Sequence, residues 1–242
     1  MSKTVLITGV SRGLGLVVAR RFLQSGWTVC GTSRKESAEW RRLAQEFGPR
    51  AEWRSCDLAV PAQVDKILFG DWLPSKRPLT AFVNNAGMAY DDLITNLRLP
   101  QLEEMFAVNV LTPMAITRQV LRNFLFHNTA GSIVHVSSIS VHAGAKGLAM
   151  YAASKGALEA FSKSTAREWG ERGIRSNCVV AGYMATEMTA VLSEEQRTKI
   201  HRRSALKRAT GAESVAATIE FLVGEGAASI TGQNVFADSG YI

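Results

Sequence analysis

The chain has 242 residues, of which 46% are hydrophobic and 20% charged, and its formal net charge is +7. This content allows a sizeable core within one domain, and no apolar stretch approaches the roughly 20 residues of a transmembrane helix. The basic residues are dispersed and not interleaved with aromatic residues, which argues against a groove for single-stranded nucleic acid and leaves a phosphate-bearing cofactor as one use of the charge.

The first 26 residues predict a strand, a glycine-rich turn and a helix. Lys3–Thr8 is the strand, and Gly9, Gly13 and Gly15 lie in the turn. Glycines let the backbone approach a ligand, and a helix N-terminus offers free N–H groups and a positive dipole to a pyrophosphate. The spacing is Gly-x-x-x-Gly-x-Gly and therefore differs from the usual Gly-x-Gly-x-x-Gly dinucleotide motif. The alternative is a tight turn without a ligand.

A second strand, Trp27–Thr32, ends at a pair of cations. In a nucleotide-binding fold this strand end meets the adenosine ribose, and an acidic residue there binds the free 2′-hydroxyl of NAD. Here the chain offers Arg34 and Lys35, with Arg12 in the glycine turn. Positive charge suits a 2′-phosphate, so we predict NADP(H) as the cofactor. The alternative is that these are solvated loop cations.

Polar residues also follow the third predicted strand, Ala51–Cys56. Asp57 either accepts a hydrogen bond from an adenine amino group or caps the next helix, predicted at Pro61–Phe69. An amphipathic helix, Ser37–Phe47, precedes this strand. The loop Gly70–Pro78 is too short to divide the chain into domains.

The fourth predicted strand, Leu79–Val83, leads into Asn84-Asn85-Ala86-Gly87. Asparagines at a strand end bind neighbouring backbone and ligand, or form an Asx turn alone. A long helix is predicted over Pro100–Phe126, with Asn109 among apolar neighbours. A buried amide needs partners, so Asn109 either kinks the helix with an ordered water or faces a site.

The fifth predicted strand, Gly131–Ser138, precedes a Gly- and Ala-rich loop, Ile139–Leu148, and a helix over Tyr151–Arg172. Tyr151 and Lys155 are four residues apart and share one helix face. We expect the ammonium to lower the pKa of the phenol, which suits a proton donor or acceptor. The hydroxyl of Ser138 can polarise a carbonyl held before the tyrosine. In the same segment, His135 is predicted to be a core or interface residue, and His142 can line a pocket.

The remaining elements are a sixth strand over Ile174–Val180, a turn from Ala181 to Thr186, helices over 187–208 and 212–223, and a last strand over 233–237. Strands alternate with helices throughout. The sequence therefore predicts an α/β fold, a single-domain Rossmann-like doubly wound parallel sheet with helices on both faces. Ligands bind such sheets at the carboxyl ends of the strands, where these motifs converge.

The cysteines Cys30, Cys56 and Cys178 lie far apart and have no metal-ligand spacing. We expect three reduced, buried thiols, a cytoplasmic protein and no metal site. The N-terminal apolar run is too short for a secretory signal.

Taken together, these residues resemble the short-chain dehydrogenase/reductase family over essentially the whole length. The resemblance rests on Thr8-Gly9-x-x-x-Gly13-x-Gly15, Asn84-Asn85-Ala86-Gly87, Asn109, Ser138, Tyr151-x-x-x-Lys155 and Gly182 to Thr186. It implies that Tyr151 exchanges a proton with the substrate and that Ser138 orients the substrate carbonyl. Lys155 would lower the pKa of Tyr151 and hold the nicotinamide ribose. Asn109 would anchor a water molecule that relays protons to Lys155.

The resemblance also implies a division of the single domain. Residues 1–90 would mainly bind the cofactor, and residues 91–242 would carry the catalytic residues and a substrate lid. The implied cofactor-binding residues are Gly9, Ser11, Arg12, Gly13, Leu14, Gly15, Arg34, Asp57, Leu58, Asn84, Ala86, Gly87, Tyr151, Lys155, Gly182, Met184 and Thr186.

Within the family, the chain is most similar to the 3-oxoacyl-[acyl-carrier-protein] reductases. Those enzymes dock an acidic carrier protein on basic residues; Arg172 matches one such position, and Thr129 replaces the second. The basic run Lys199–Arg208 either takes its place or is a solvated helix face. Two motifs usual in those enzymes differ here: Pro-Gly is replaced by Ala181-Gly182, and Asp-Gly-Gly by Asp238-Ser239-Gly240. These differences weaken an assignment to housekeeping fatty-acid synthesis. A ketoreductase of a secondary-metabolite or polyketide pathway is the other interpretation.

The predicted activity is NADPH-dependent reduction of a ketone, with a carrier- or CoA-linked 3-oxoacyl thioester as substrate. A free alcohol, sugar, steroid or secondary-metabolite ketone is the alternative within the family. A non-catalytic nucleotide-sensing or nucleic-acid-binding regulator is the alternative of another class. The complete set of Ser138, Tyr151, Lys155 and Asn109 speaks against it. The family implies a homotetramer or homodimer that pairs helices 100–126 and 151–172 between subunits.

Overall fold

The computed structural model describes residues 3–70, 72–73, 77–185 and 193–242. Within these ranges, seven strands form one sheet in the order β3-β2-β1-β4-β5-β6-β7, and every neighbouring pair is parallel. The order reverses between β1 and β4, so a crevice for a ligand is expected outside their carboxyl ends. The strands are β1 Thr4–Thr8, β2 Thr28–Ser33, β3 Ala51–Ser55, β4 Ala81–Asn84, β5 Ser132–Ser138, β6 Arg175–Ala181 and β7 Asn234–Ala237.

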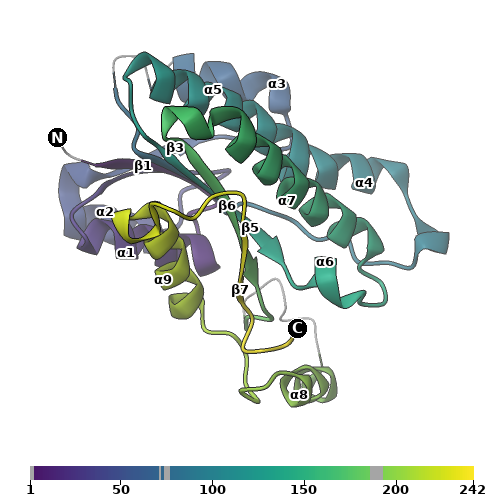
Figure 1. Cartoon of the computed structure of the whole chain (residues 1–242). Coiled ribbons are helices and arrows are strands. Elements are labelled where there is room, and N and C mark those ends of the chain that lie inside the picture. The colour runs from purple at the N-terminus through teal and green to yellow at the C-terminus, as the bar shows by residue number, and fades with distance from the viewer. Residues whose placement is uncertain (1–2, 71, 74–76, 186–192) are drawn as a thin grey trace.

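Helices cover both faces of the sheet (Figure 1). One face carries α1 (Gly13–Gln24), α2 (Ala38–Phe47) and α9 (Ala212–Val223). The other face carries α3 (Pro61–Val64), α4 (Leu99–Phe106), α5 (Thr112–Phe126) and α7 (Ala149–Trp169). The doubly wound fold predicted from the sequence is therefore confirmed.

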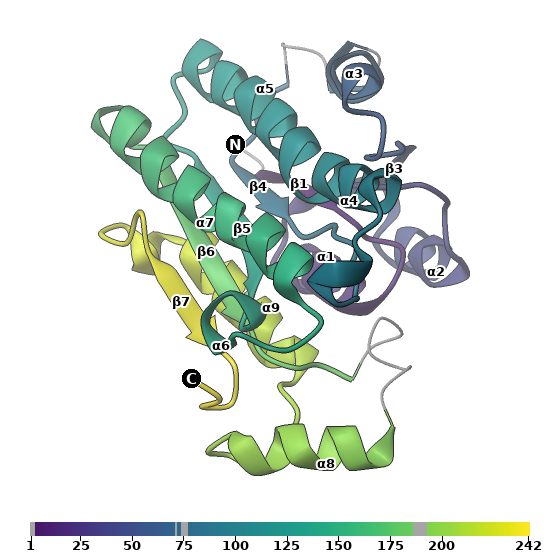
Figure 2. The same cartoon turned by 90° about the vertical axis from the view of Figure 1, so that its right-hand side faces the viewer.

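Two further helices, α6 (Ser140–Ala143) and α8 (Glu194–Arg203), lie beyond the carboxyl ends of the strands (Figure 2). The sequence predicted a loop over 139–148, so α6 was missed; four residues are too few for a periodic signal. Helix α8 ends at Arg203, five residues before the end of the predicted 187–208 helix, whose residues 187–192 lie outside the described part of the chain. Ser193 caps it, and Gln196 completes a reciprocal capping box.

The inner strands β1 and β4 form because they are mostly apolar runs that are buried on both faces. Val5, Leu6 and Ile7 of β1 are all fully buried, as expected in a parallel sheet covered by helices. At one point of β2 only a glycine fits: a Cβ on Gly31 would lie 2.6 Å from the Trp40 ring of α2. This contact allows α2 to pack directly on the sheet.

Two predicted helices contain π-helical segments. The helix predicted over 61–69 is α3 followed by a π-helical turn at Asp65–Gly70. The helix predicted over 100–126 is divided into α4 and α5 by a π-helical segment at Ala107–Leu111. Such segments are uncommon and often occur at functional sites. Asn109 lies in the second one.

Among the described residues, no helix combines the length and apolarity needed to cross a membrane. In the same part of the chain, no group of three or more His, Cys, Asp or Glu side chains is arranged to hold a metal ion. Cys30, Cys56 and Cys178 are free thiols in buried positions, as predicted.

Candidate active site

The strand register brings the predicted site segments to one edge of the sheet. Thr8 pairs with Thr32, Asn84 with His135, and Ser138 with Ala181. The glycine turn, Arg34, the Asn84–Gly87 segment and Gly182 follow directly after these strand ends. The convergence predicted from the sequence is therefore present in the fold.

Ser138 and Tyr151 come from different elements and meet at this edge. Ser138 is the last residue of β5, and Tyr151 lies in the first turn of α7. The Ser138 hydroxyl lies close enough to the Tyr151 phenol to lower its pKa. The Ser138 Oγ atom also accepts a hydrogen bond from the Ser140 backbone N–H at 3.2 Å. Two hydroxyls held together can both donate to one carbonyl oxygen.

Lys155 lies one helical turn after Tyr151. Its Nζ atom is 5.9 Å from the centroid of the Tyr151 ring and donates to the backbone oxygen of Val136 at 3.0 Å. A Cβ on Gly87 would lie 3.0 Å from that Nζ. Glycine at this position therefore leaves open space beside the ammonium, where ligand hydroxyls can reach it.

The pKa of Tyr151 differs from the sequence-based expectation. Burial raises the pKa of Tyr151 to about 12, and the negative charge of Asp91 adds to this; the hydrogen bond with Ser138 acts in the opposite direction. The predicted lowering by Lys155 is therefore wrong, because burial disfavours the phenolate and the ammonium binds Val136 instead. Burial also lowers the pKa of Lys155 to about 8.

Asn109 faces the site from the π-helical segment. Its Oδ1 atom accepts from the Met88 backbone N–H at 2.9 Å, and its Nδ2 atom donates to the Met88 carbonyl at 2.8 Å and to Ser154 Oγ at 3.0 Å. Ser154 in turn donates to the Tyr151 carbonyl at 2.7 Å. The amide thus links the segment after β4 to the first turn of α7. The sequence analysis did not identify Ser154, although it lies within the Tyr151–Lys155 motif.

The glycine turn has the geometry of a phosphate cradle. Gly9 and Gly13 have φ values of 76° and 55°, a region that favours glycine. A Cβ on Gly15 would lie 2.1 Å from the Gly9 carbonyl oxygen. Arg12 is the N-cap residue of α1 and has no side-chain capping bond there. The N–H groups of the first turn can therefore bind a pyrophosphate, so these residues fit a dinucleotide.

Thr8 holds the turn and the neighbouring segment in place. Its Oγ1 atom accepts from the backbone N–H groups of Asn85 at 3.1 Å and Ala86 at 3.0 Å. Asn85 Nδ2 donates to the carbonyls of Thr8 at 2.9 Å and Gly9 at 3.2 Å. The side chains of Thr8 and Asn85 thus fix the glycine turn against the segment that follows β4. The signal in the sequence is the hydroxyl of Thr8 directly before the first glycine of the turn.

The cation cluster predicted for a 2′-phosphate follows β2. The Gly9 and Val10 N–H groups both donate to the Thr32 carbonyl, which fixes the glycine turn against the end of that strand. Arg34 and Lys35 come next and are exposed, as is Arg12. Three cations are therefore presented to solvent where the two segments meet.

Asp57 does not cap α3 as one reading proposed. Its Oδ1 atom accepts from the Ala59 N–H at 3.0 Å, whereas Val60 is the N-cap residue. The neighbouring Leu58 carbonyl accepts from Thr112 Oγ1 at 2.7 Å. The Asp57 side chain is exposed.

Gly182 packs against the C-terminal segment. A Cβ there would lie 2.3 Å from Thr210 Oγ1, and the Gly182 N–H donates to the Ala237 carbonyl at 2.9 Å. Met184 is half-buried and packs against the core cluster beneath α1 and α9. Thr186, the last predicted cofactor contact, lies outside the described residues.

The two histidines singled out in the sequence have different environments. His135 is fully buried and contacts Asn84 through Nδ1, so its assignment as a core residue is confirmed. Burial lowers the pKa of His135 to about 3, and the nearby charge of Lys155 acts in the same direction. His142 instead contacts Glu159 and packs edge-on against Phe236.

Comparisons with known proteins agree with this geometry. A family model described as enoyl-(acyl carrier protein) reductase matches residues 9–242. The 3-oxoacyl-[acyl-carrier-protein] reductase FabG of Salmonella typhimurium is 30% identical over 244 residues, covering 98% of this chain and 96% of that protein. FabG of Aquifex aeolicus is 32% identical, with the same coverage of 98% and 96%.

Solved structures superpose over nearly the whole chain. A variant of the actinorhodin polyketide ketoreductase with NADPH gives a TM-score of 0.90 at 28% identity and covers 99% of this chain and 97% of its own. A Beutenbergia cavernae protein described as an NAD(P)-dependent gluconate 5-dehydrogenase, with bound NADP, gives 0.90 at 28% identity, with coverage of 99% and 96%.

Proposed function

Because the chain belongs to the short-chain dehydrogenase/reductase family, we propose that it reduces the 3-oxo group of an acyl thioester to a secondary alcohol with NADPH. The family makes it an NAD(P)-dependent oxidoreductase of the ketoreductase type. The observation that carries the proposal is the approach of the Ser138 hydroxyl to the Tyr151 phenol, with the Lys155 ammonium one turn away. The choice of a thioester as the substrate is more specific than the reaction type, and it is supported by the similarity to FabG.

The cofactor site is built from the segments after β1, β2 and β4. The glycine turn Gly9–Gly15 binds the pyrophosphate, and Arg34, Lys35 and Arg12 bind the 2′-phosphate. Lys155 and the segment at Gly87 hold the nicotinamide ribose. The structural relatives with NADPH or NADP support this choice of cofactor. When bound, NADPH supplies the hydride. In this division of labour, residues 1–90 mainly bind the cofactor, and residues 91–242 act on the substrate.

The protein residues hold and deliver the proton. Tyr151 is protonated at neutral pH, since burial raises its pKa further above neutrality, to about 12, and it acts as the acid of the reduction. Ser138 donates a second hydrogen bond to the carbonyl oxygen, which orients the carbonyl and stabilises the negative charge that develops there. Asn109 fixes the first turn of α7 through Ser154. It also anchors a water molecule that passes a proton to Lys155, and Lys155 returns that proton to Tyr151.

An acidic carrier protein is the proposed source of the thioester. Arg172 is exposed in the 3₁₀ helix Gly170–Arg172 that follows α7 and precedes the amino end of β6. The basic run Lys199–Arg208 belongs largely to α8, which lies beyond the carboxyl edge of the sheet (Figure 2). There Lys199, Arg202 and Arg203 line a shallow depression with Tyr241. Opposite charge steers such a partner toward the site and raises its association rate.

A free polyhydroxy ketone is the second candidate substrate. The match to a protein described as a gluconate 5-dehydrogenase favours it. The description of the matching family model names an enoyl reductase. The hydroxyls of Ser138 and Tyr151 are arranged to bind an oxygen, which favours a carbonyl substrate over an enoyl one.

The test measures NADPH oxidation with matched substrates. We expect kcat/KM to be highest for a 3-oxoacyl thioester, lower for free ketones and 5-ketogluconate, and lowest for the 2-enoyl thioester of equal chain length. Turnover of free ketones without thioesters would overturn the thioester assignment. Oxidation of NADPH by none of them, together with salt-dependent retention on DNA, would favour a regulatory role.

A further inference from the structure

Glu159 is a buried carboxylate that the proposed mechanism does not use. It lies on α7, one turn beyond Lys155, and only 6% of its surface is exposed. Burying an ionised carboxylate is costly unless several donors satisfy its oxygens. A buried carboxylate whose hydrogen-bond donors come from several separate elements therefore indicates a specific role for that carboxylate.

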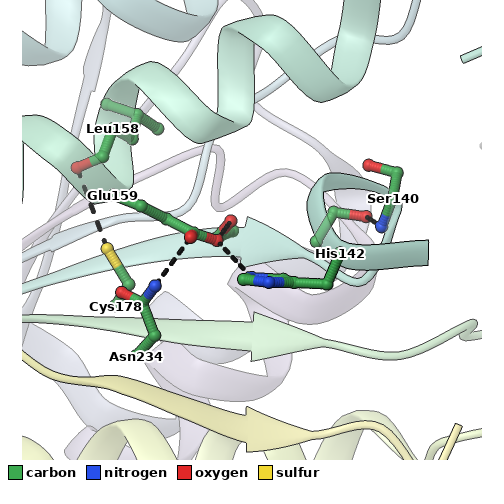
Figure 3. Close-up of polar contacts among 8 residues, drawn as sticks. Ser140, His142, Leu158, Glu159, Cys178 and Asn234 are labelled. Atoms are coloured by element: carbon green, nitrogen blue, oxygen red, sulfur yellow. Dashed lines mark hydrogen bonds and ion pairs between the residues drawn. The ribbon is translucent and has the colours of Figure 1, made fainter. Parts of the chain in front are cut away.

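Three other elements supply those partners (Figure 3). Ser137 of β5 donates from its Oγ atom to Oε1 at 2.5 Å, and His142 of α6 approaches the same oxygen with Nε2 at 3.1 Å. Asn234 of β7 donates from Nδ2 to Oε2 at 2.6 Å. The charged acceptor strengthens each bond. A single carboxylate thus joins β5, α6 and β7 to the helix that carries Tyr151.

These contacts surround Ser138. Ser137 directly precedes it, and His142 follows four residues later. Ser138 Oγ must stay within hydrogen-bond distance of Tyr151, yet the two residues lie on separate elements. Glu159 holds the strand on one side of Ser138 and the short helix on the other against α7, and so determines the separation of the two hydroxyls.

We propose that Glu159 is a positioning residue for carbonyl reduction, which sets the alignment of Ser138 with Tyr151 through its bonds to Ser137 and His142. The proposal rests on the reduction proposed above. Glu159 does not touch the substrate. Its loss misaligns the two donors at the carbonyl oxygen and slows the chemical step, while the cofactor site after β1 and β2 is left intact.

The primary test replaces Glu159 with glutamine. Glu159→Gln keeps the shape of the side chain but removes the negative charge. It also replaces one acceptor oxygen with an NH₂ group, which then faces the donors that bound the carboxylate. We expect kcat to fall about 10- to 100-fold, as misplacement of catalytic groups produces, with the Kd for NADPH unchanged. The deuterium isotope effect on kcat, measured with NADPH deuterated at C4, should rise because hydride transfer becomes more rate-limiting.

Two further variants separate positioning from stability. Ser137→Ala removes the bond to β5 alone and should also lower kcat and raise the isotope effect. Ser162→Ala is the matched control, since it deletes another buried bond of α7, to Ser176 at 2.8 Å. It should lower the melting temperature while leaving the isotope effect unchanged. An isotope effect is a ratio of rates, so partial unfolding does not alter it.

The proposal is overturned if Glu159→Gln and Ser137→Ala keep the wild-type isotope effect, whatever their kcat. Crystal structures of the wild type and Glu159→Gln provide a readout that does not depend on activity. We expect the distance between Ser138 Oγ and the Tyr151 hydroxyl oxygen to increase in the variant; an unchanged distance would also overturn the proposal. Failure of the proposed function would be recognised separately, as a wild-type enzyme that reduces no carbonyl compound.

Discussion

At the scale of single residues, the protonation states of buried groups set the chemistry. The phenol of Tyr151 is stabilised in its neutral form, which suits proton donation rather than proton abstraction. Sequence spacing alone suggested the opposite shift, because it shows that an ammonium is near but does not show how much water the fold removes. Burial of side chains is the result of tertiary packing, and this explains why the pKa of Tyr151 was not predictable.

Replacing Tyr151 with phenylalanine tests the proton donor. Tyr151→Phe should lower kcat by about 10²- to 10⁴-fold, the usual contribution of a general acid. The Kd for NADPH should change little, because the ring and its packing remain. Stopped-flow NADPH oxidation and fluorescence titration measure the two quantities. Near-normal turnover in this variant would exclude Tyr151 as the acid.

Arg34 tests the choice of cofactor. Arg34→Asp removes a charge-assisted hydrogen bond to the 2′-phosphate and adds repulsion, so NADPH binding should weaken about 10- to 100-fold. NADH carries no such phosphate and should bind about as well as before. Calorimetric titration of both cofactors compares them. An equal loss of affinity for both would contradict the role of Arg34.

His135 makes stability depend on pH. Its pKa is about 3 in the folded chain against 6.5 when exposed, so below pH 6.5 only the unfolded chain takes up this proton. Stability should therefore fall as the pH falls from 6.5 toward 3, by about 2 kcal/mol between pH 7 and roughly pH 5. Lys155 is protonated in both states in this range and adds no slope.

Urea denaturation of the wild type and His135→Gln at both pH values measures this term. The variant lacks the titrating group, so its free energy of unfolding should depend less steeply on pH. Identical pH dependence in the two proteins would show that His135 is not the group responsible.

At the scale of elements, the sequence predicted which segments are strands and which are helices because their apolar periodicity is strong. It did not predict the π-helical segment at Ala107–Leu111 or helix α6. A π-helical segment pairs each residue with the fifth one along the chain, and as a short bulge inside an α-helix it leaves the apolar pattern of the flanking turns nearly unchanged. Its cause lies in tertiary contacts, namely those of Asn109 with Met88 and Ser154.

The glycine turn gives a prediction at this scale. Gly15→Ala places a Cβ 2.1 Å from the Gly9 carbonyl oxygen, so the turn must shift. We expect a loss of about 1–3 kcal/mol in stability, as in overpacked sites, and a marked loss of NADPH affinity. Gly156→Ala in α7 is the control, because its Cβ meets only Val141 at 3.5 Å.

Thermal unfolding and cofactor titration of both variants provide the comparison. The alanine in α7 should be neutral or slightly stabilising, since glycine costs about 0.5–1 kcal/mol in a helix. If Gly15→Ala bound NADPH as tightly as the wild type, the turn would not be the phosphate site.

At the scale of the whole molecule, the helical stretch formed by α4, the π-helical segment and α5 presents apolar side chains to solvent. Leu99 is 61% exposed, Leu111 53% and Phe126 69%. Large apolar side chains exposed along one stretch favour association. We therefore predict a dimer or tetramer that buries this face, as the family resemblance implied for the helices 100–126 and 151–172.

Light scattering of the wild type and of Leu111→Glu measures this association. We expect the wild type to be oligomeric and the variant to dissociate, because a charge in an apolar interface is strongly disfavoured. A wild type that is monomeric at high micromolar concentration would refute the predicted interface.

The hydrogen bond from Asn234 to Glu159 has a consequence for biosynthesis. The ribosome produces Ser137, His142 and Glu159 well before Asn234. Until Asn234 is made, the Oε2 atom of Glu159 in the nascent chain lacks its hydrogen-bond donor. Folding of the centre around Ser138 is therefore completed late, when β7 docks as the last strand at the sheet edge. A nascent chain arrested before β7 would already contain all four candidate catalytic side chains and yet should remain inactive.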